Sequence, residues 1–259
     1  MMIPRYIHQI FLSGRPPLRL AENVQSLKDR NPGWEHRLYS NDDAEYFISE
    51  HYDQRMLDTY RLINPRYGAA RADLLRHLLI YKIGGVYLDI KSDLSKPLDE
   101  VLHPDDHYIL VQWDNGPGKP HQGFGLHPEL AHILGGEYQT HHIIAAPCHP
   151  FSKATIDRIV ANIRGYKPWS GVGKMGVVRT TGPSAYTLAV HPLRNSSPHR
   201  AATEEELGAS LSIAKYDHGA VFKKHYSILR SPVARLSIPA RIVQIVLEGL
   251  RDLMRAFHG

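Results

Sequence analysis

Cysteine is almost missing from this chain of 259 residues, and long apolar runs are missing altogether. The single Cys148 excludes a framework of internal disulfide bonds and gives no sign of an oxidising compartment. In the segment APCHP we expect this thiol to be packed in the interior. No apolar stretch is long enough to predict a membrane span, and the N-terminus lacks the pattern of a signal peptide. We therefore expect a cytoplasmic protein.

Excess charge is missing from most of the chain, because the formal charge of +5 resides in the C-terminal tail. Residues 223–259 contain seven Lys and Arg residues and two acidic residues, so the positive and negative charges of residues 1–222 are equal in number. Apolar residues recur there at helical spacing, at Ile242, Val243, Val246, Leu250, Leu253, Met254 and Phe257. Such a helix either packs on the main domain, which is the commoner arrangement, or binds an anionic membrane surface. No nucleic-acid-binding module is recognisable, so we expect no nucleic-acid partner.

Alternating strand and helix patterns predict an α/β sheet for residues 1–222. A hydrophobic content of 42% is sufficient for a sizeable core. Turn signals such as Asn31-Pro32-Gly33 separate the elements, and Asn41-Asp42-Asp43 is expected to cap a helix. The expected strands are 6–11, 36–39, 86–90, 108–113 and 142–146, and the expected helices are 20–31, 42–51, 69–83 and 150–163. Gly116 to His127 is rich in glycine and proline and predicts a loop.

Residues 72–99 contain the most informative pattern, a helix, a two-glycine turn and a strand that ends in acidic residues. Gly84-Gly85 stops the helix where a left-handed backbone is needed. If the following strand continues to Asp93, its period of two places Asp89, Lys91 and Asp93 on one face. In an open α/β sheet, ligands lie at the carboxyl ends of strands. A divalent cation or a sugar diphosphate would suit this group.

Asp73 and Arg76 precede that strand on the helix, and their spacing of three allows both to face the same cleft. The alternative is a surface ion pair that contributes little to stability. The residues alone leave these two interpretations about equally supported, since short acidic motifs often occur by chance.

The string RADLLRHLLIYKIGGVYLDI resembles the core of the DXD-type sugar transferases, glycosyltransferase family 32. That family has an Asp and an Arg on a helix, a Gly-Gly turn and then Tyr-x-Asp-x-Asp. The segments IPRYIHQIFLSGRPP, NPGWEHRLYSNDDAEYFI, HHIIAAPCHPF and TTGPSAYTL are similar to other family segments, so the resemblance spans roughly Ile3 to Leu188. The matching motif residues are Asp73, Arg76, Gly84, Gly85, Tyr87 and Asp89.

One departure from the family pattern is Lys91, which occupies the place of the second Asp in the DXD motif. A protonated lysine cannot ligate a metal ion. Three accounts stay open: Asp93 replaces the missing ligand, Lys91 itself neutralises the diphosphate, or the site has lost catalysis. The first two are equally favoured over the third, because the rest of the motif is intact.

The resemblance implies a GT-A-like fold and a retaining transfer of a hexose from a nucleotide-diphosphate sugar to a glycan or glycolipid hydroxyl, as in surface polysaccharide synthesis. It implies catalytic roles for Asp73, Arg76 and Asp89, and a cofactor of Mn²⁺ or Mg²⁺ held by Asp89 and Asp93. The residues that it places at the donor are Ile7, His8, Gln9, Tyr87, Lys91, Thr181, Gly182 and His225.

A competing hypothesis is a non-catalytic module that binds a nucleotide sugar or a membrane surface, and it is motivated by Lys91 and the basic tail. The expected domains are a catalytic domain in residues 1–222 and a basic amphipathic tail in residues 223–259. If the tail binds lipid, the protein would be peripheral on the inner face of the membrane.

Overall fold

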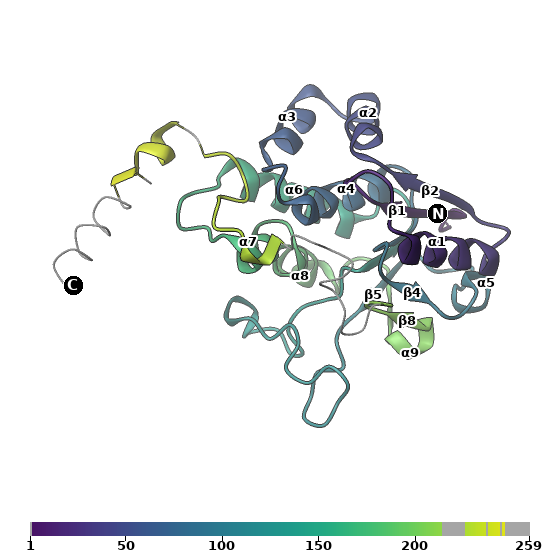
Figure 1. The fold of residues 1–259 in the computed structure, drawn as a ribbon. Coiled ribbons are helices and arrows are strands. Elements are labelled where there is room, and N and C mark those ends of the chain that lie inside the picture. Colours follow the sequence, from purple (N-terminus) through teal and green to yellow (C-terminus); the bar gives the residue numbers. More distant parts are fainter. Residues whose placement is uncertain (1, 214–225, 237, 244, 247–259) are drawn as a thin grey trace.

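A six-stranded mixed sheet forms the centre of the protein in a computed structural model that describes residues 2–213, 226–236, 238–243 and 245–246 (Figure 1). The strand order is β2-β1-β3-β6-β5-β7, and a second sheet pairs β4 with β8. Strand β1 is parallel to both β2 and β3, whereas β6 runs antiparallel to β3 and β5. The strands are β1 (Tyr6–Ile10), β2 (Glu35–Tyr39), β3 (Gly85–Leu88), β4 (Asp93–Leu94), β5 (Tyr108–Val111), β6 (His142–Ala145), β7 (Arg200–Ala202) and β8 (Ala209–Ser210).

Helices cover both faces of the large sheet. On one face, Leu27 of helix α1 packs with Ile7 and Val86, and on the other, Leu78 of helix α4 packs in the cluster that contains Tyr87. Figure 1 shows α2, α3, α4 and α6 together on the second side. The helices are α1 (Leu18–Arg30), α2 (Asn41–His51), α3 (Gln54–Leu62), α4 (Gly68–Lys82), α5 (Leu98–Val101), α6 (Pro150–Arg164), α7 (Gly173–Thr180), α8 (Pro183–Val190) and α9 (Glu204–Leu207), with short 3₁₀ turns η1 (Pro128–Leu130), η2 (His191–Leu193) and η3 (Tyr226–Ile228).

Helix α4 lies between the sheet and the outer helices, and its polar residues are buried along with its apolar ones. It ends at a turn in which Gly84 and Gly85 have φ angles of 77° and 104°. A Cβ atom on Gly84 would come within 2.6 Å of Pro147, so this position also requires glycine for space. The expected left-handed turn is therefore confirmed, and it directs the chain from α4 straight into β3.

The mixed α/β architecture expected from the sequence is confirmed, and most predicted boundaries agree within two residues. The end of strand β3 is the difference that matters for the site: the strand ends at Leu88, two residues earlier than expected, and Asp89 begins a turn. The cap of α2 is Ser40 in a capping box with Asp43, instead of Asn41. Cys148 is exposed, which corrects the expectation of interior packing, because it lies in a turn with a φ angle of 60°.

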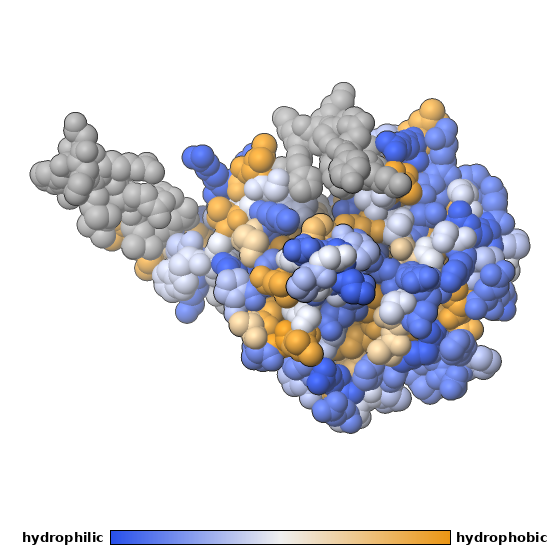
Figure 2. Space-filling model, turned by 90° about the horizontal axis from the view of Figure 1, so that it is seen from below, coloured by the Kyte–Doolittle hydropathy of each residue, from blue (hydrophilic) through white to orange (hydrophobic). Residues whose placement is uncertain are grey.

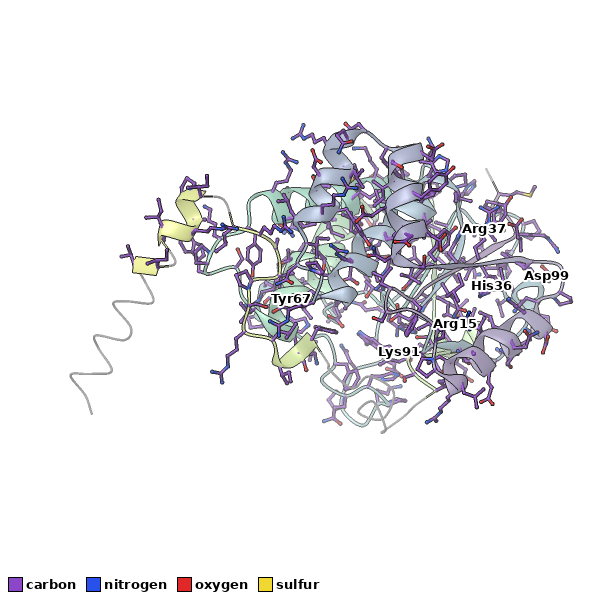
Figure 3. All side chains as sticks on the ribbon, turned by 45° about the horizontal axis from the view of Figure 1, so that its top comes forward. Arg15, His36, Arg37, Tyr67, Lys91 and Asp99 are labelled. Carbon is purple, nitrogen blue, oxygen red and sulfur yellow. The ribbon has the colours of Figure 1, made fainter. Side chains whose placement is uncertain are left out.

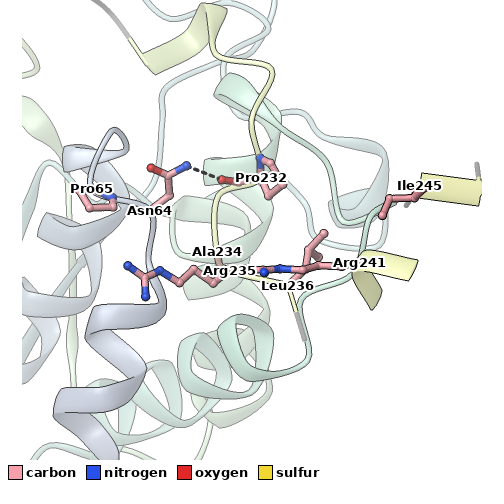
Figure 4. Close-up of a pocket in the computed structure, with 8 residues that line it drawn as sticks. All are labelled: Asn64, Pro65, Pro232, Ala234, Arg235, Leu236, Arg241 and Ile245. Atoms are coloured by element: carbon pink, nitrogen blue, oxygen red, sulfur yellow. Dashed lines mark hydrogen bonds between the residues drawn. The ribbon is translucent and has the colours of Figure 1, made fainter. Parts of the chain in front are cut away.

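Part of the C-terminal segment packs against the main domain. Val233 and Ala234 are fully buried, and Ala234 bridges to Ile63. The packed body therefore extends beyond the boundary expected at residue 222. An open cavity of about 570 Å³ lies here, where Asn64 donates a hydrogen bond to the carbonyl oxygen of Pro232 at 3.0 Å (Figure 4).

The helix that follows presents apolar side chains to solvent. Ile238 is 76% exposed and Ile245 is 68% exposed, and Ile242, Val243 and Val246 are exposed as well. Over its described part, the predicted amphipathic helix is thus formed with its large apolar residues exposed, and Ala240 packs against the core of the domain. Residues 250–257 of the predicted stripe lie outside the described residues. Within the described part of the chain, none of the helices has the length and apolar content needed to cross a membrane.

Candidate sugar-transfer site

Helix α4 and strand β3 bring four of the predicted site residues into direct contact. Arg76 donates to Asp73 Oδ1 at 2.6 Å, and its Nη1 lies 3.4 Å from Asp89 Oδ1. The hydroxyl of Tyr87 donates to the same Asp89 oxygen at 2.6 Å. Arg76 also donates to the carbonyl oxygen of Thr140 and lies 4.7 Å above the ring of Tyr87. The guanidinium therefore links two carboxylates at the carboxyl end of β3.

Burial sets the electrostatics of this network. Asp73 and Arg76 are both almost fully buried, so the alternative of a surface ion pair is wrong. Burial raises the pKa of Asp73, and the charge of Arg76 opposes this rise. Burial also opposes the charged form of Arg76, but Tyr87, Asp89 and Asp73 raise its pKa overall. Arg76 is thus a permanent cation, and the pair resists solvent screening.

The junction of α7 and α8 contributes a further hydrogen bond to the network. Thr181 donates its hydroxyl hydrogen to Asp73 Oδ2 at 2.8 Å, so both oxygens of Asp73 are engaged. Gly182 caps α8, and a Cβ atom there would lie 3.0 Å from the Cα of Val178. The structure therefore brings Thr181 to the acidic pair, while Gly182 allows the two helices to approach closely.

Three predicted donor residues on β1 make different contacts. The side chain of Ile7 packs in the core with Val86. His8 is bound between the hydroxyl of Tyr39 at 3.0 Å and the carbonyl oxygen of Gly84 at 2.9 Å. Gln9 accepts from His36 at 2.8 Å, and its buried Nε2 has no partner among the described residues. The side chains of Ile7 and His8 therefore support the fold, and Gln9 is the one of the three with an unused donor.

The acidic residues after β3 do not share one face, which corrects the sequence expectation. Ser92 donates its backbone N–H to the carbonyl oxygen of Asp89, closing a turn between Asp89 and Asp93. Beyond that turn, Asp93 belongs to β4 and forms an ion pair with Arg30 of α1 at 2.9 Å. The two carboxylates predicted as metal ligands are therefore separated, and Asp93 already has a cationic partner.

The described donor set does not fit a divalent ion held by two carboxylates. Asp89 is the only member of the expected pair that remains in the network, and Arg76 lies beside it. Among the described residues there is no group of three His, Cys, Asp or Glu side chains that could hold a metal ion. His225, a predicted donor contact, lies outside the described residues.

Two further residues approach the network without having been predicted. Tyr226 of η3 is half-buried, and desolvation together with the charges of Asp73 and Asp89 raises its pKa to about 12. His141 follows the loop after β5, accepts the backbone N–H of Asp89 through its carbonyl oxygen at 2.7 Å and stacks on Trp113. Both reach the site through long-range packing. The only sequence signals were their positions beside the noted His225 and within HHIIAAPCHPF.

The face of the molecule seen in Figure 2 has hydrophobic surface interspersed with hydrophilic surface. Exposed apolar side chains of the long loop after β5 include Phe124, Leu126 and Leu134. Figure 3 places Lys91 toward the middle of the molecule, whereas His36, Arg37 and Asp99 lie toward its right-hand edge. The cavity of Figure 4 is separate from this centre, because none of the predicted site residues that the structure describes lines it.

Comparison with known sequences shows that these residues lie within the match to a protein-family model. A family model described as "Glycosyltransferase sugar-binding region containing DXD motif" matches residues 17–115, which include Asp73, Arg76, Tyr87, Asp89 and Lys91. The chain is 31% identical over 103 residues to inositol phosphoceramide mannosyltransferase 3 of Schizosaccharomyces pombe, covering 39% of this chain and 28% of the relative. It is 33% identical over 101 residues to the mannosyl phosphorylinositol ceramide synthase SUR1 of Saccharomyces cerevisiae, covering 39% and 26%. The chain thus spans less than a third of the length of these curated relatives.

Comparison with solved structures concerns the fold. The UDP-bound glycosyltransferase domain of the YGT toxin superposes with a TM-score of 0.57 at 10% identity, covering 84% of this chain and 82% of that domain. The PaToxG glycosyltransferase gives a TM-score of 0.54 at 16% identity, covering 74% and 70%. The expected resemblance to the DXD-type sugar transferases is therefore confirmed through residues 17–115, and the fold is that of GT-A-type glycosyltransferase domains.

Proposed function

We propose that this protein is a retaining glycosyltransferase that moves a hexose from a nucleotide-diphosphate sugar to a hydroxyl of a glycan or glycolipid. The observation that supports this most strongly is the Asp73–Arg76–Asp89 network at the end of β3, in which Asp73 and Arg76 are almost fully buried. Polar groups buried this deeply are costly unless they are paired, so their presence beside a strand end favours a binding or catalytic role. The glycosyltransferase names of the relatives favour sugar transfer over other chemistry.

The network suits the charges that develop during sugar transfer. Cleavage of the anomeric bond leaves positive charge on the sugar ring and negative charge on the departing diphosphate. In our proposal, Asp73 and Arg76 bind hydroxyls of the transferred sugar, with Arg76 held in position by Asp89 and the Thr140 carbonyl. A rigid guanidinium fork is well suited to orienting a polyol. We assign no carboxylate as a nucleophile.

Mannose is the proposed sugar because relatives with a match to this chain are named mannosyltransferases. A nucleoside diphosphate is the proposed leaving group, and the UDP bound to a structural neighbour, the glycosyltransferase domain of the YGT toxin, is consistent with it. The alternative is a module that binds such donors without turning them over. It is favoured by Lys91, which stands where the DXD motif has its second aspartate.

We also propose that the C-terminal helix binds an anionic membrane surface, so that a lipid-linked glycan is a suitable acceptor. Its described isoleucine and valine side chains are exposed, and Arg230, Arg235 and Arg241 precede or interrupt them. Basic residues near an anionic surface each contribute on the order of 1 kcal/mol, and apolar side chains add burial in the lipid.

A panel of sugar nucleotides tests the proposed donor class. GDP-mannose, UDP-glucose, UDP-galactose and UDP-N-acetylglucosamine would each be added at a saturating concentration, and the thermal unfolding midpoint would be measured. We expect one of them to raise the midpoint and the matching free sugar not to raise it, since a ligand that binds only the folded state stabilises it. The Arg76→Met variant should lose this protection, whereas a surface variant, Lys153→Met, should retain it. Equal midpoints with all donors would contradict the proposal.

A further inference from the structure

The turn that contains Lys91 is fixed from several directions. Ser92 donates its N–H to Asp89, and Asn23 of α1 donates to the carbonyl oxygens of Ile90 at 3.1 Å and Ser92 at 2.9 Å. From the other side, Ile213 donates its N–H to the carbonyl oxygen of Lys91 at 2.8 Å. The hydroxyl of Ser92 donates in addition to the carbonyl oxygen of Leu211. The backbone of Lys91 is therefore held in one position, directly after Asp89.

The positive charge of Lys91 lies near the sugar-transfer site. Its charge favours the ionised form of Asp73 and disfavours protonation of His141, whose pKa lies well below the usual value chiefly because of burial. Among the described residues, no carboxylate lies within 4.0 Å of its ammonium group. Asp93, which might have neutralised it, is bound to Arg30 instead.

His141 provides a second, independent observation. The residue is 3% exposed, and its Nδ1 has no hydrogen-bond partner among the described residues. A buried polar atom without a partner is costly, so a ligand atom is a reasonable partner for it. Because the carbonyl oxygen of His141 accepts the backbone N–H of Asp89 at 2.7 Å, the residue with the unsatisfied atom lies directly beside the turn that contains Lys91.

We propose that the ammonium of Lys91 takes the place of the divalent cation against the diphosphate of the donor. This inference rests on the proposed function. During transfer the bond between the anomeric carbon and the diphosphate oxygen breaks, and its electron pair stays on that oxygen. Lys91 stabilises the negative charge that forms there. The acceptor oxygen forms the new bond to the anomeric carbon, and its proton passes to the released diphosphate.

Calorimetric titration with free nucleoside diphosphates tests the inference without depending on turnover. UDP, GDP, ADP, CDP and dTDP would be titrated into the wild-type protein in excess EDTA and again in excess MnCl₂. We expect one of them to bind in EDTA with an affinity within about threefold of that in MnCl₂. Lys91→Met should weaken binding in EDTA by about tenfold or more, as expected for the loss of one charge-assisted hydrogen bond. Lys153→Met removes an exposed lysine that pairs with Asp157 on α6 and should change nothing.

The Lys91→Asp variant restores the aspartate of the family motif and sharpens the test. We expect its binding to be lost in EDTA and recovered in MnCl₂, whereas the wild type should bind in both conditions. Wild-type binding that requires MnCl₂ would overturn the role of Lys91 but leave the proposed function standing. Absence of binding by all five nucleotides in both conditions, with folding confirmed by circular dichroism, would overturn the proposed function and this inference together.

Discussion

Asp73 and Arg76 are neighbours on helix α4, because a spacing of three on a helix places the two side chains together. Thr181 and Thr140, which are distant in sequence, form hydrogen bonds with this pair in the folded protein. The pair is therefore enclosed by tertiary contacts and is not a surface ion pair.

Asp73→Asn is expected to destabilise the protein as well as to reduce turnover. The substitution leaves Arg76 buried with only Asp89 as a charged partner, and breaking a buried pair costs about 3 kcal/mol. Asp89→Asn, at a partly exposed carboxylate, should lower kcat by about 100-fold with a smaller change in stability. Urea unfolding and kcat would be measured on both. Asp157→Asn, at an exposed ion pair on α6, is the matched control, and a destabilisation equal to that of Asp73→Asn would contradict the account.

Acid is expected to weaken the fold through His8. Burial lowers the pKa of His8 from 6.5 to about 4, so the folded state binds a proton less readily than the unfolded state. Above pH 6.5 both states are neutral, and between pH 6.5 and pH 4 only the unfolded state gains the proton. The free energy of unfolding should therefore fall over this window, by up to about 3 kcal/mol from this residue.

Urea unfolding of the wild-type protein and of His8→Gln at pH 7 and pH 5 measures that contribution. The variant should lose less stability between the two pH values than the wild type does. His103→Gln, in the exposed loop before β5, is the control, and its stability should change between the two pH values as much as that of the wild type. An identical pH dependence in the wild type and His8→Gln would refute the assignment.

At the scale of elements, the end of β3 is where sequence reasoning failed. Period-two alternation predicted that Asp89, Lys91 and Asp93 continue one strand face. The strand stops at Leu88 because Asn23 and Ile213 bind the backbone of the following turn, and neither contact is visible in a local pattern. The helix, the glycine turn and the first strand residues were predictable because each depends on neighbours within a few positions.

Asp93 is expected to have a structural role in the connection between α1 and β4. Asp93→Ala should lower stability by about 0.5–1 kcal/mol, because it removes a partly exposed ion pair with Arg30. Nucleotide affinity should stay within about twofold of the wild type in both EDTA and MnCl₂. A loss of manganese-dependent binding in Asp93→Ala alone would restore Asp93 as a metal ligand.

The C-terminal helix is expected to bind anionic vesicles through its exposed apolar side chains. Co-sedimentation with vesicles of phosphatidylcholine and phosphatidylglycerol would be compared for the full chain and for a chain that ends at Leu236. We expect the full chain to sediment and the shortened chain to remain in solution, and neither to bind pure phosphatidylcholine. Ile242→Glu with Ile245→Glu should reduce binding, whereas Leu18→Glu, at an exposed leucine of α1, should not. Equal sedimentation of the two chains would mean that the helix has another role.

At the scale of the whole molecule, the α/β class and the central motif were predictable, while the completed site was not. The sheet order places β6 antiparallel between β3 and β5, which brings His141 next to Asp89. The opposite side of the site is formed by Thr181, at the junction of α7 and α8, and by Tyr226 of η3. These parts come from residues far apart in the chain, so only the folded arrangement reveals that they share one centre.

Release of nucleoside diphosphate from a sugar nucleotide tests the central claim most directly. The full chain would be incubated with each donor of the panel, with and without a simple glycoside acceptor, and the released diphosphate would be quantified over time. We predict turnover of one donor by the wild type and by Asp157→Asn, and a loss of about 100-fold or more in Asp89→Asn. Retention of near-native turnover in Asp89→Asn, or binding without release of diphosphate in the wild type, would contradict the account.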